Sequence, residues 1–260
     1  MGHNAGMDID LVLLAVALFI GVMVGLTGVG AGALMTPILI GGFGVTAAVA
    51  IATDLLFATV TKILGVVIHG RAGRVDWRTA RSLWLGSIPG VLLGSALLVG
   101  LVVTGAGQWL TWLIVVVVGV TSVTLLRRAL VNPDRQPSEQ GPAPRWLGPA
   151  GGAGIGLGVS LTSVGAGVLG MALLVRLSPR DTAPQRLVAT DLLHAIPIAL
   201  IAGVSYSFSG LVDWMLLVTL LMGSLPGVVV GSFLSKFIPS KVLNLTLGLV
   251  LLALAAFLVI

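Results

Sequence analysis

Residues 26–34 read LTGVGAGAL and residues 161–169 read LTSVGAGVL, with seven of nine positions identical. Three more stretches recur in the same order: ATDLL at 52–56 and 189–193, VDW at 75–77 and 212–214, and GSIPGVLLGS at 86–95 as GSLPGVVVGS at 223–232. These last three pairs keep one offset of 137 residues. Four ordered matches indicate that the chain is a duplicated unit.

The composition is that of a membrane protein. Of the 260 residues, 57% are hydrophobic and 9% are charged, whereas a soluble domain carries about 25% charged residues. The chain has no cysteine, which excludes disulfides and Cys-based metal sites. The net charge of +5 is concentrated in a few loops, so we interpret it as an orientation signal and expect no nucleic-acid partner. We predict a multi-pass protein of the cell inner (plasma) membrane.

Most apolar segments have the length of one bilayer crossing, roughly 20 residues. Six such spans are predicted: 45–70, 82–103, 109–126, 187–208, 211–235 and 242–260. Two further segments, 11–42 and 148–175, would extend about 48 and 42 Å as single helices, which is too long for one crossing. Both are interrupted by the Gly-rich motif.

Arginine and lysine in the loops predict how these segments cross. Basic residues occur in loops 71–81, 127–147, 176–186 and 236–241, and are missing from loops 104–108 and 209–210. The basic loops should be cytoplasmic. Segment 148–175 then starts and ends inside, so we predict a re-entrant hairpin that turns at 163–167. By the repeat, segment 11–42 does the same from outside and turns at 28–32.

The predicted fold is an all-α integral membrane protein of two inverted repeats, each a broken re-entrant helical hairpin plus three transmembrane helices. The predicted parts are an N-terminal tail (1–10), repeat 1 (11–126), a cytoplasmic linker (127–147) and repeat 2 (148–260). Inverted repeats are typical of alternating-access carriers. The alternative is that both Gly-rich segments are long, tilted helices, which gives eight spans and parallel repeats.

The Gly-rich turns are candidates for substrate binding. Non-helical backbone inside lipid is tolerated only where protein or a watery cavity satisfies it. The return arm of each hairpin starts a helix whose free N–H groups suit an anion. The candidate residues in these turns are Thr27, Gly28, Gly30, Gly32, Thr162, Ser163, Gly165 and Gly167. The alternative is that these small residues only pack helices closely.

Charged residues inside the spans are further candidates. Asp54 and Asp191 lie at equivalent, deep positions, and intramembrane acids often mark ion or proton pathways; alternatively they hold the broken backbone. His194 lies three residues after Asp191 on the same helical face, as a proton relay or a structural residue. Lys62 either attracts the anionic substrate or reaches toward the cytoplasmic side.

Motifs of common enzymes are missing from the chain. It has no HExxH, no GxSxG and no P-loop. We therefore predict that the protein is not an enzyme, and that it has no catalytic residues, no bound metal and no cofactor.

The repeated motifs resemble the sulfite exporter TauE/SafE family. The resemblance rests on LTGVGAGAL followed by Thr36-Pro37, on ATDLL, GRVDW and GSIPGVLLGS, and on their second copies, and it covers residues from about 10 to 260. The resemblance implies a permease of seven or eight segments for sulfite, an organosulfonate such as sulfoacetate, or another small anion. The family often has three glycines where this chain has Gly30-Ala31-Gly32 and Gly165-Ala166-Gly167.

These observations together predict a secondary transporter of a small anion, sulfite or an organosulfonate, that works by alternating access with proton coupling. The alternatives are a passive anion channel and a transporter of a small carboxylate. The expected partners are the anionic substrate, a proton or other coupling ion, and membrane lipid. The sequence is also compatible with a homo-oligomer.

Overall fold

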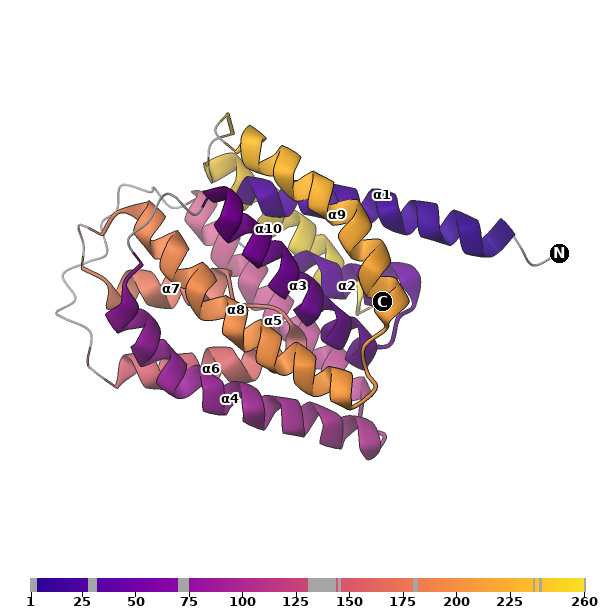
Figure 1. Cartoon of the computed structure of the whole chain (residues 1–260), viewed down its shortest axis with the longest axis horizontal. Coiled ribbons are helices and arrows are strands. Elements are labelled where there is room, and N and C mark those ends of the chain that lie inside the picture. Colours follow the sequence, from indigo (N-terminus) through magenta and orange to yellow (C-terminus); the bar gives the residue numbers. More distant parts are fainter. Residues whose placement is uncertain are drawn as a thin grey trace.

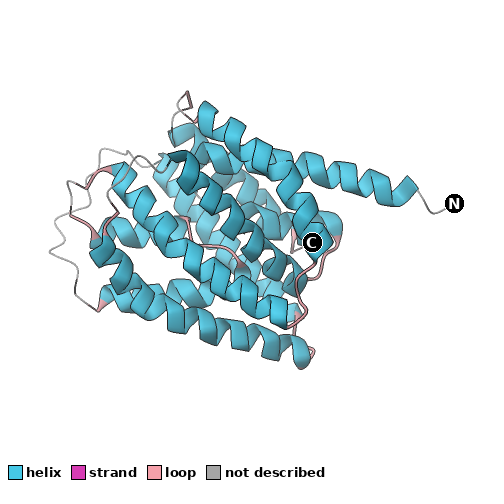
Figure 2. Ribbon diagram, in the orientation of Figure 1, coloured by secondary structure: helices cyan, strands magenta, loops and turns pink. Residues whose placement is uncertain are grey.

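The chain is helical throughout its regular structure (Figures 1 and 2). The structure is a computed structural model that describes residues 4–27, 32–69, 75–130, 144, 146–179, 182–235, 237–238 and 240–259. Within these ranges there is no strand, and the predicted all-α class is confirmed.

The described residues form five helices from each repeat. Repeat 1 contributes α1 (Asn4–Thr27), α2 (Gly32–Phe43), α3 (Ala47–His69), α4 (Trp77–Val103) and α5 (Gln108–Leu130). Repeat 2 contributes α6 (Leu147–Thr162), α7 (Val168–Leu177), α8 (Pro184–Phe208), α9 (Trp214–Leu234) and α10 (Ser240–Phe257).

Five helices of the described part are long and apolar enough to cross a membrane, namely α3, α4, α5, α8 and α9. The sixth predicted span corresponds to α10, whose apolar stretch Lys241–Phe257 is shorter. Each overlong segment is divided between two helices, α1 and α2 in repeat 1 and α6 and α7 in repeat 2. The first division falls at 28–31, outside the described residues. Helix α1 already begins at Asn4, so most of the predicted tail is helical.

The main helix pairs join the two repeats. Helix α1 packs along α9, α6 along α4, α3 against α8, and α5 against α10. Exchanging every helix for its repeat equivalent leaves this set of pairs unchanged. In Figure 1 the α1–α9 pair and the α4–α6 pair form opposite edges of the molecule, with α3 and α8 between them.

Glycines of the repeated GSxPG motif make two of these pairs possible. A methyl group at Gly86 of α4 would overlap the backbone of Pro149 in α6. At the equivalent Gly223 of α9, a methyl group would overlap the backbone of Leu14 in α1. Small residues let membrane helices approach closely, which strengthens their packing. The doubled motif therefore has a structural explanation.

The equivalent helices α3 and α8 lie side by side and run in opposite directions in Figure 1. Two equivalent hydrogen bonds join the repeats. The backbone N–H of Asp76, before α4, donates to Thr190 Oγ1 near the start of α8 (3.0 Å). The N–H of Asp213, before α9, donates to Thr53 Oγ1 near the start of α3 (3.1 Å). The two bonds lie toward opposite ends of the α3–α8 pair. How these ends face the membrane stays a prediction.

Candidate functional site

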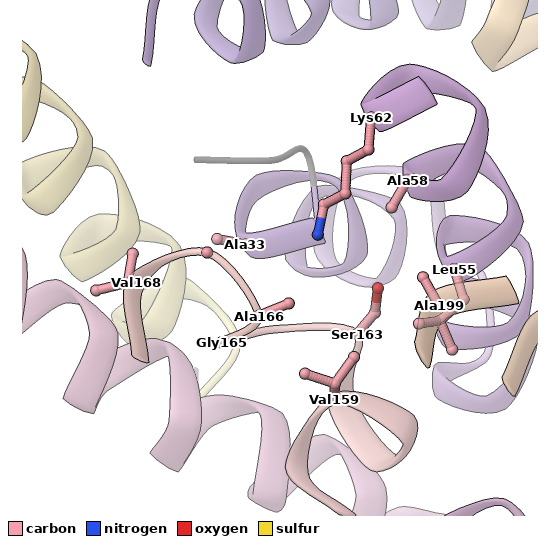
Figure 3. A pocket seen from close by; sticks show the side chains of 11 residues that line it. Ala33, Leu55, Ala58, Lys62, Val159, Ser163, Gly165, Ala166, Val168 and Ala199 are labelled. Carbon is pink, nitrogen blue, oxygen red and sulfur yellow. The ribbon is translucent and has the colours of Figure 1, made fainter. Parts of the chain in front are cut away.

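A small cavity lies where the hairpin helices meet α3 and α8. Its lining includes Ala33 at the start of α2, Lys62 of α3, Ser163 and Gly165 between α6 and α7, and Ala199 of α8. Figure 3 shows the Lys62 ammonium and the Ser163 hydroxyl pointing into this space from different sides. Both broken segments and both central helices therefore contribute to one site.

The break between α6 and α7 follows from a left-handed turn of the backbone. Ser163 ends α6 with φ of 57° and Gly165 follows with φ of 102°. Both φ values lie in the left-handed region, which residues other than glycine rarely adopt. The N–H groups of Leu169 and Gly170 donate to Gly165 O, and that of Met171 donates to Gly167 O. Gly167 and Val168, which start the helix before these bonded groups, line the cavity. The turn therefore presents a helix N-terminus to the site.

Lys62 and Ser163 are the polar side chains that line the cavity. Lys62 is only 6% exposed, and it forms no hydrogen bond or close ion pair with the described residues. Ser163 Oγ is also buried without a hydrogen-bond partner in that part of the chain. Because unpartnered polar groups are costly to bury, these two are available to a ligand.

Asp54 lies on α3 two helical turns before Lys62 and is fully buried. Its Oδ2 accepts a hydrogen bond of 2.6 Å from Thr36 Oγ1 of α2. The Ser163 hydroxyl lies near the same carboxyl group, outside hydrogen-bond geometry. Asp54 therefore has one hydroxyl donor, on α2, while its Oδ1 has no hydrogen-bond partner among the described residues.

Asp191, the equivalent acid on α8, has different surroundings. It is 4% exposed, and its Oδ1 has no hydrogen-bond donor among the described residues. That oxygen packs against Gly170 of α7, where a methyl group would overlap it. The charges that act on Asp191 are those of Lys62 and Arg128. Lys62 is therefore near both acids, and the two differ in that Asp54 accepts a hydrogen bond from Thr36 whereas no hydrogen bond to Asp191 is found among the described residues.

His194 contacts α4 and does not line the cavity. Its Nε2 lies 3.1 Å from Ser87 Oγ, and its carbonyl oxygen accepts a hydrogen bond from Trp84 Nε1. The repeat equivalent of His194 is Phe57, and Ser224, the equivalent of Ser87, has no hydroxyl partner in the described part of the chain. The His194–Ser87 contact therefore belongs to one half of the molecule alone.

The predicted substrate-binding residues divide into three groups. The structure brings four of them to one cavity: Lys62, Ser163, Gly165 and Gly167. Thr162 instead donates its hydroxyl to its own helix, at Gly158 O (2.7 Å). Gly32 begins α2 beside the lining residue Ala33. Gly28, Gly30 and the side chain of Thr27 lie outside the described residues. The role of all these residues in binding substrate stays a prediction.

Sequence reasoning missed the polar partners of the predicted acids and histidine. In the sequence, Thr36, the donor to Asp54, stands out only as part of a motif, and Ser87 only as part of the repeated GSxPG stretch. The signal for Ser87 was its place in a doubled motif. The signal for Thr36 was a hydroxyl one turn into the return arm of a hairpin.

The sequence matches the profile of the family described as sulfite exporter TauE/SafE over residues 13–258. The chain belongs to the sulfite exporter TauE/SafE family. It is 33% identical over 244 residues to the probable membrane transporter protein YjnA of Bacillus subtilis (strain 168), covering 90% of this chain and 92% of that protein. A probable membrane transporter protein of Xylella fastidiosa (strain 9a5c) is 26% identical, with 92% and 91% covered.

A further relative, the probable membrane transporter protein YdhB of Bacillus subtilis (strain 168), is 24% identical, with 90% of this chain and 94% of that protein covered. No solved structure matches the chain. The family resemblance is confirmed, and this TauE/SafE member is a multi-pass transporter of the cell membrane.

Proposed function

We propose that this TauE/SafE protein carries a small anion, sulfite or an organosulfonate, by alternating access with proton coupling. The supporting observation is the cavity that joins Lys62, Ser163 and the start of α7. An ammonium group, a hydroxyl and helix N-terminal N–H groups together suit the oxygens of a compact anion. The remaining lining is largely apolar, as at Ala33 and Ala199, which leaves room for a short organic group beside the charged head.

The size of the cavity supports a carrier over a channel. Its volume of about 20 Å³ is enough for about one water molecule. An anion such as sulfite needs a wider conformation, so it must enter after helices move. Rocking of one helical unit against another around a central site is how carriers with inverted repeats work.

The two buried acids support proton coupling. Asp54 follows Thr53, which bonds to the start of α9, and Asp191 follows Thr190, which bonds to the start of α4. The acids therefore flank the cavity toward opposite ends of the α3–α8 pair. Intramembrane acids often mark proton pathways, so each of these carboxyl groups is a candidate for the residue that carries the proton.

Flux into liposomes tests this proposal. Purified protein would be reconstituted, and uptake of radiolabelled sulfite and sulfoacetate followed under an imposed pH gradient, at neutral pH or above, where sulfite is ionised. We expect saturable uptake, counterflow with unlabelled substrate, and accumulation driven by the gradient. Protein-free liposomes control for leakage.

Other outcomes would replace the proposal. Uptake restricted to acetate would assign a carboxylate substrate. Flux that neither saturates nor shows counterflow would assign an anion channel. Saturable sulfite uptake that ignores the pH gradient would remove proton coupling and retain the carrier.

A further inference from the structure

Two buried acids share one buried cation inside this transporter. Among the described residues, the buried charged side chains are Asp54, Asp191 and Lys62. Lys62 lies within electrostatic reach of both carboxyl groups. Because one cation cannot neutralise two carboxylates and a substrate anion, the three must compete for it.

Asp54 depends less than Asp191 on the positive charge of Lys62. Its carboxyl group accepts the short hydrogen bond from Thr36 and has the Ser163 hydroxyl nearby. Hydrogen bonds to a carboxylate compensate part of the cost of burying it. The Thr36 donor belongs to α2 and does not depend on whether Lys62 is engaged elsewhere.

The Oδ1 atoms of both acids lack a donor among the described residues, but Asp54 accepts the Thr36 bond at its Oδ2, whereas no hydrogen bond to Asp191 is found in that part of the chain. Helix α7 faces it with Gly170, α3 with Lys62, and α5 with Arg128, which is partly exposed near the end of its helix. On its own helix, His194 lies one turn away, turned toward Ser87. Lys62 is therefore the buried group that compensates Asp191, and Asp191 loses that compensation if Lys62 turns to a substrate.

We propose that Lys62 is a shared counter-ion, balancing the charge of Asp191 through space when the site is empty and binding the substrate anion when it is filled, so that Asp191 takes up a proton as the anion binds. This inference rests on the proposed function. In the empty site, the charges of Lys62 and Asp191 cancel. In the filled site, Lys62 and one negative charge of the anion cancel, and protonated Asp191 is neutral. One proton therefore accompanies each negative charge that Lys62 neutralises.

The same geometry distinguishes the two halves. Ala199 of α8 occupies the position equivalent to Lys62 and lines the same cavity. Asp54 of α3 therefore has no lysine on α8 that would correspond to Lys62 beside Asp191. Asp191 is the coupling residue in this scheme, and Asp54 positions the hairpin of α2 through Thr36. Asp54→Asn is thus a matched control for Asp191→Asn.

Thermal unfolding of the full-length protein in detergent tests the pairing without any substrate. Lys62→Ala should lower the unfolding midpoint by about 5–10 °C, because it leaves a buried carboxylate without its cation. Adding Asp191→Asn should restore most of the loss, and adding Asp54→Asn should not. Equal restoration by both second substitutions, or an unchanged midpoint in Lys62→Ala, would overturn the shared counter-ion.

Transport tests the coupling itself. In liposomes loaded with a pH-sensitive dye, the ratio of gradient-driven sulfite accumulation to sulfite counterflow should fall about tenfold or more in Asp191→Asn. The ratio should fall much less in Asp54→Asn. A larger fall in Asp54→Asn would overturn the assignment. If the wild-type protein moves neither sulfite nor sulfoacetate, the proposed substrate class fails, while the thermal series still decides the pairing.

Discussion

The two repeats of this transporter share one scaffold. The hydrogen bond from Asp76 N–H to Thr190 is matched by the bond from Asp213 N–H to Thr53, at 3.0 and 3.1 Å. The helix pairs are likewise equivalent, and each fourth helix packs through glycine against the first helix of the other repeat. The helix scaffold is therefore equivalent in the two halves.

The side chains at the centre differ between the halves. Lys62 lines the cavity in repeat 1 where repeat 2 has Ala199. A hydroxyl of α2 binds Asp54, whereas Gly170 of α7 packs against Asp191. The difference teaches that duplication sets where the site lies, and that single substitutions decide which half holds the charge. A site with two unlike halves can bind one anion in one defined orientation.

The largest effect is expected at Lys62, the buried cation that lines the cavity. Lys62→Ala should lower the transport efficiency for sulfite roughly 10- to 100-fold, because a hydrogen bond to a charged group contributes about 1.5–3 kcal/mol. Adding Ala199→Lys places a cation at the equivalent position and should recover part of the uptake. Initial rates in liposomes measure both. Full activity of Lys62→Ala would show that the charge difference between the two halves does not matter for transport.

The second prediction concerns the shared scaffold. Gly86→Ala should destabilise the protein by roughly 1–3 kcal/mol, since the new methyl group overlaps the α6 backbone. Gly223→Ala should do the same against α1. Gly100→Ala is the control on α4, because its methyl group meets open space, and it should be neutral or stabilise by up to about 1 kcal/mol. Thermal unfolding in detergent compares the three, and unequal losses at Gly86 and Gly223 would break the equivalence.

The smallest effect is expected at the serines of the doubled motif. Ser87→Ala should cost about 1 kcal/mol, because it removes the hydrogen-bond partner of His194. Ser224→Ala should be nearly silent, since that hydroxyl has no partner among the described residues. Phe57→His would offer Ser224 the missing partner. Equal losses in the two alanine variants would show that the halves do not differ here.

Much of the fold could be predicted from the sequence, because length and hydropathy set where helices can cross a membrane. The predicted span 45–70 corresponds to α3, and the predicted turn at 163–167 falls between α6 and α7. The predicted span 82–103 begins inside α4, which starts at Trp77, because Asp76 caps the helix and its first turn is polar. Hydropathy does not detect a polar first turn.

The site was only partly predictable. Lys62 and Ser163 stood out, one as a charge inside a span and the other as part of a doubled turn, and they line one cavity. The pairing of Thr36 with Asp54, and of Ser87 with His194, depends on which helices lie side by side. That arrangement comes from packing between the repeats, which no local pattern in the sequence reveals.

The most direct test of the account asks whether equivalent residues of the two repeats face opposite sides of the membrane. Trp77 and Trp214 begin α4 and α9, are 52% and 57% exposed, and occupy equivalent positions in a chain without cysteine. Trp77→Cys and Trp214→Cys would be labelled in intact cells with a membrane-impermeant maleimide. The account predicts that Trp214→Cys is labelled from outside and that Trp77→Cys is labelled only after the cells are permeabilised. Labelling of both from the same side would contradict the inverted repeat.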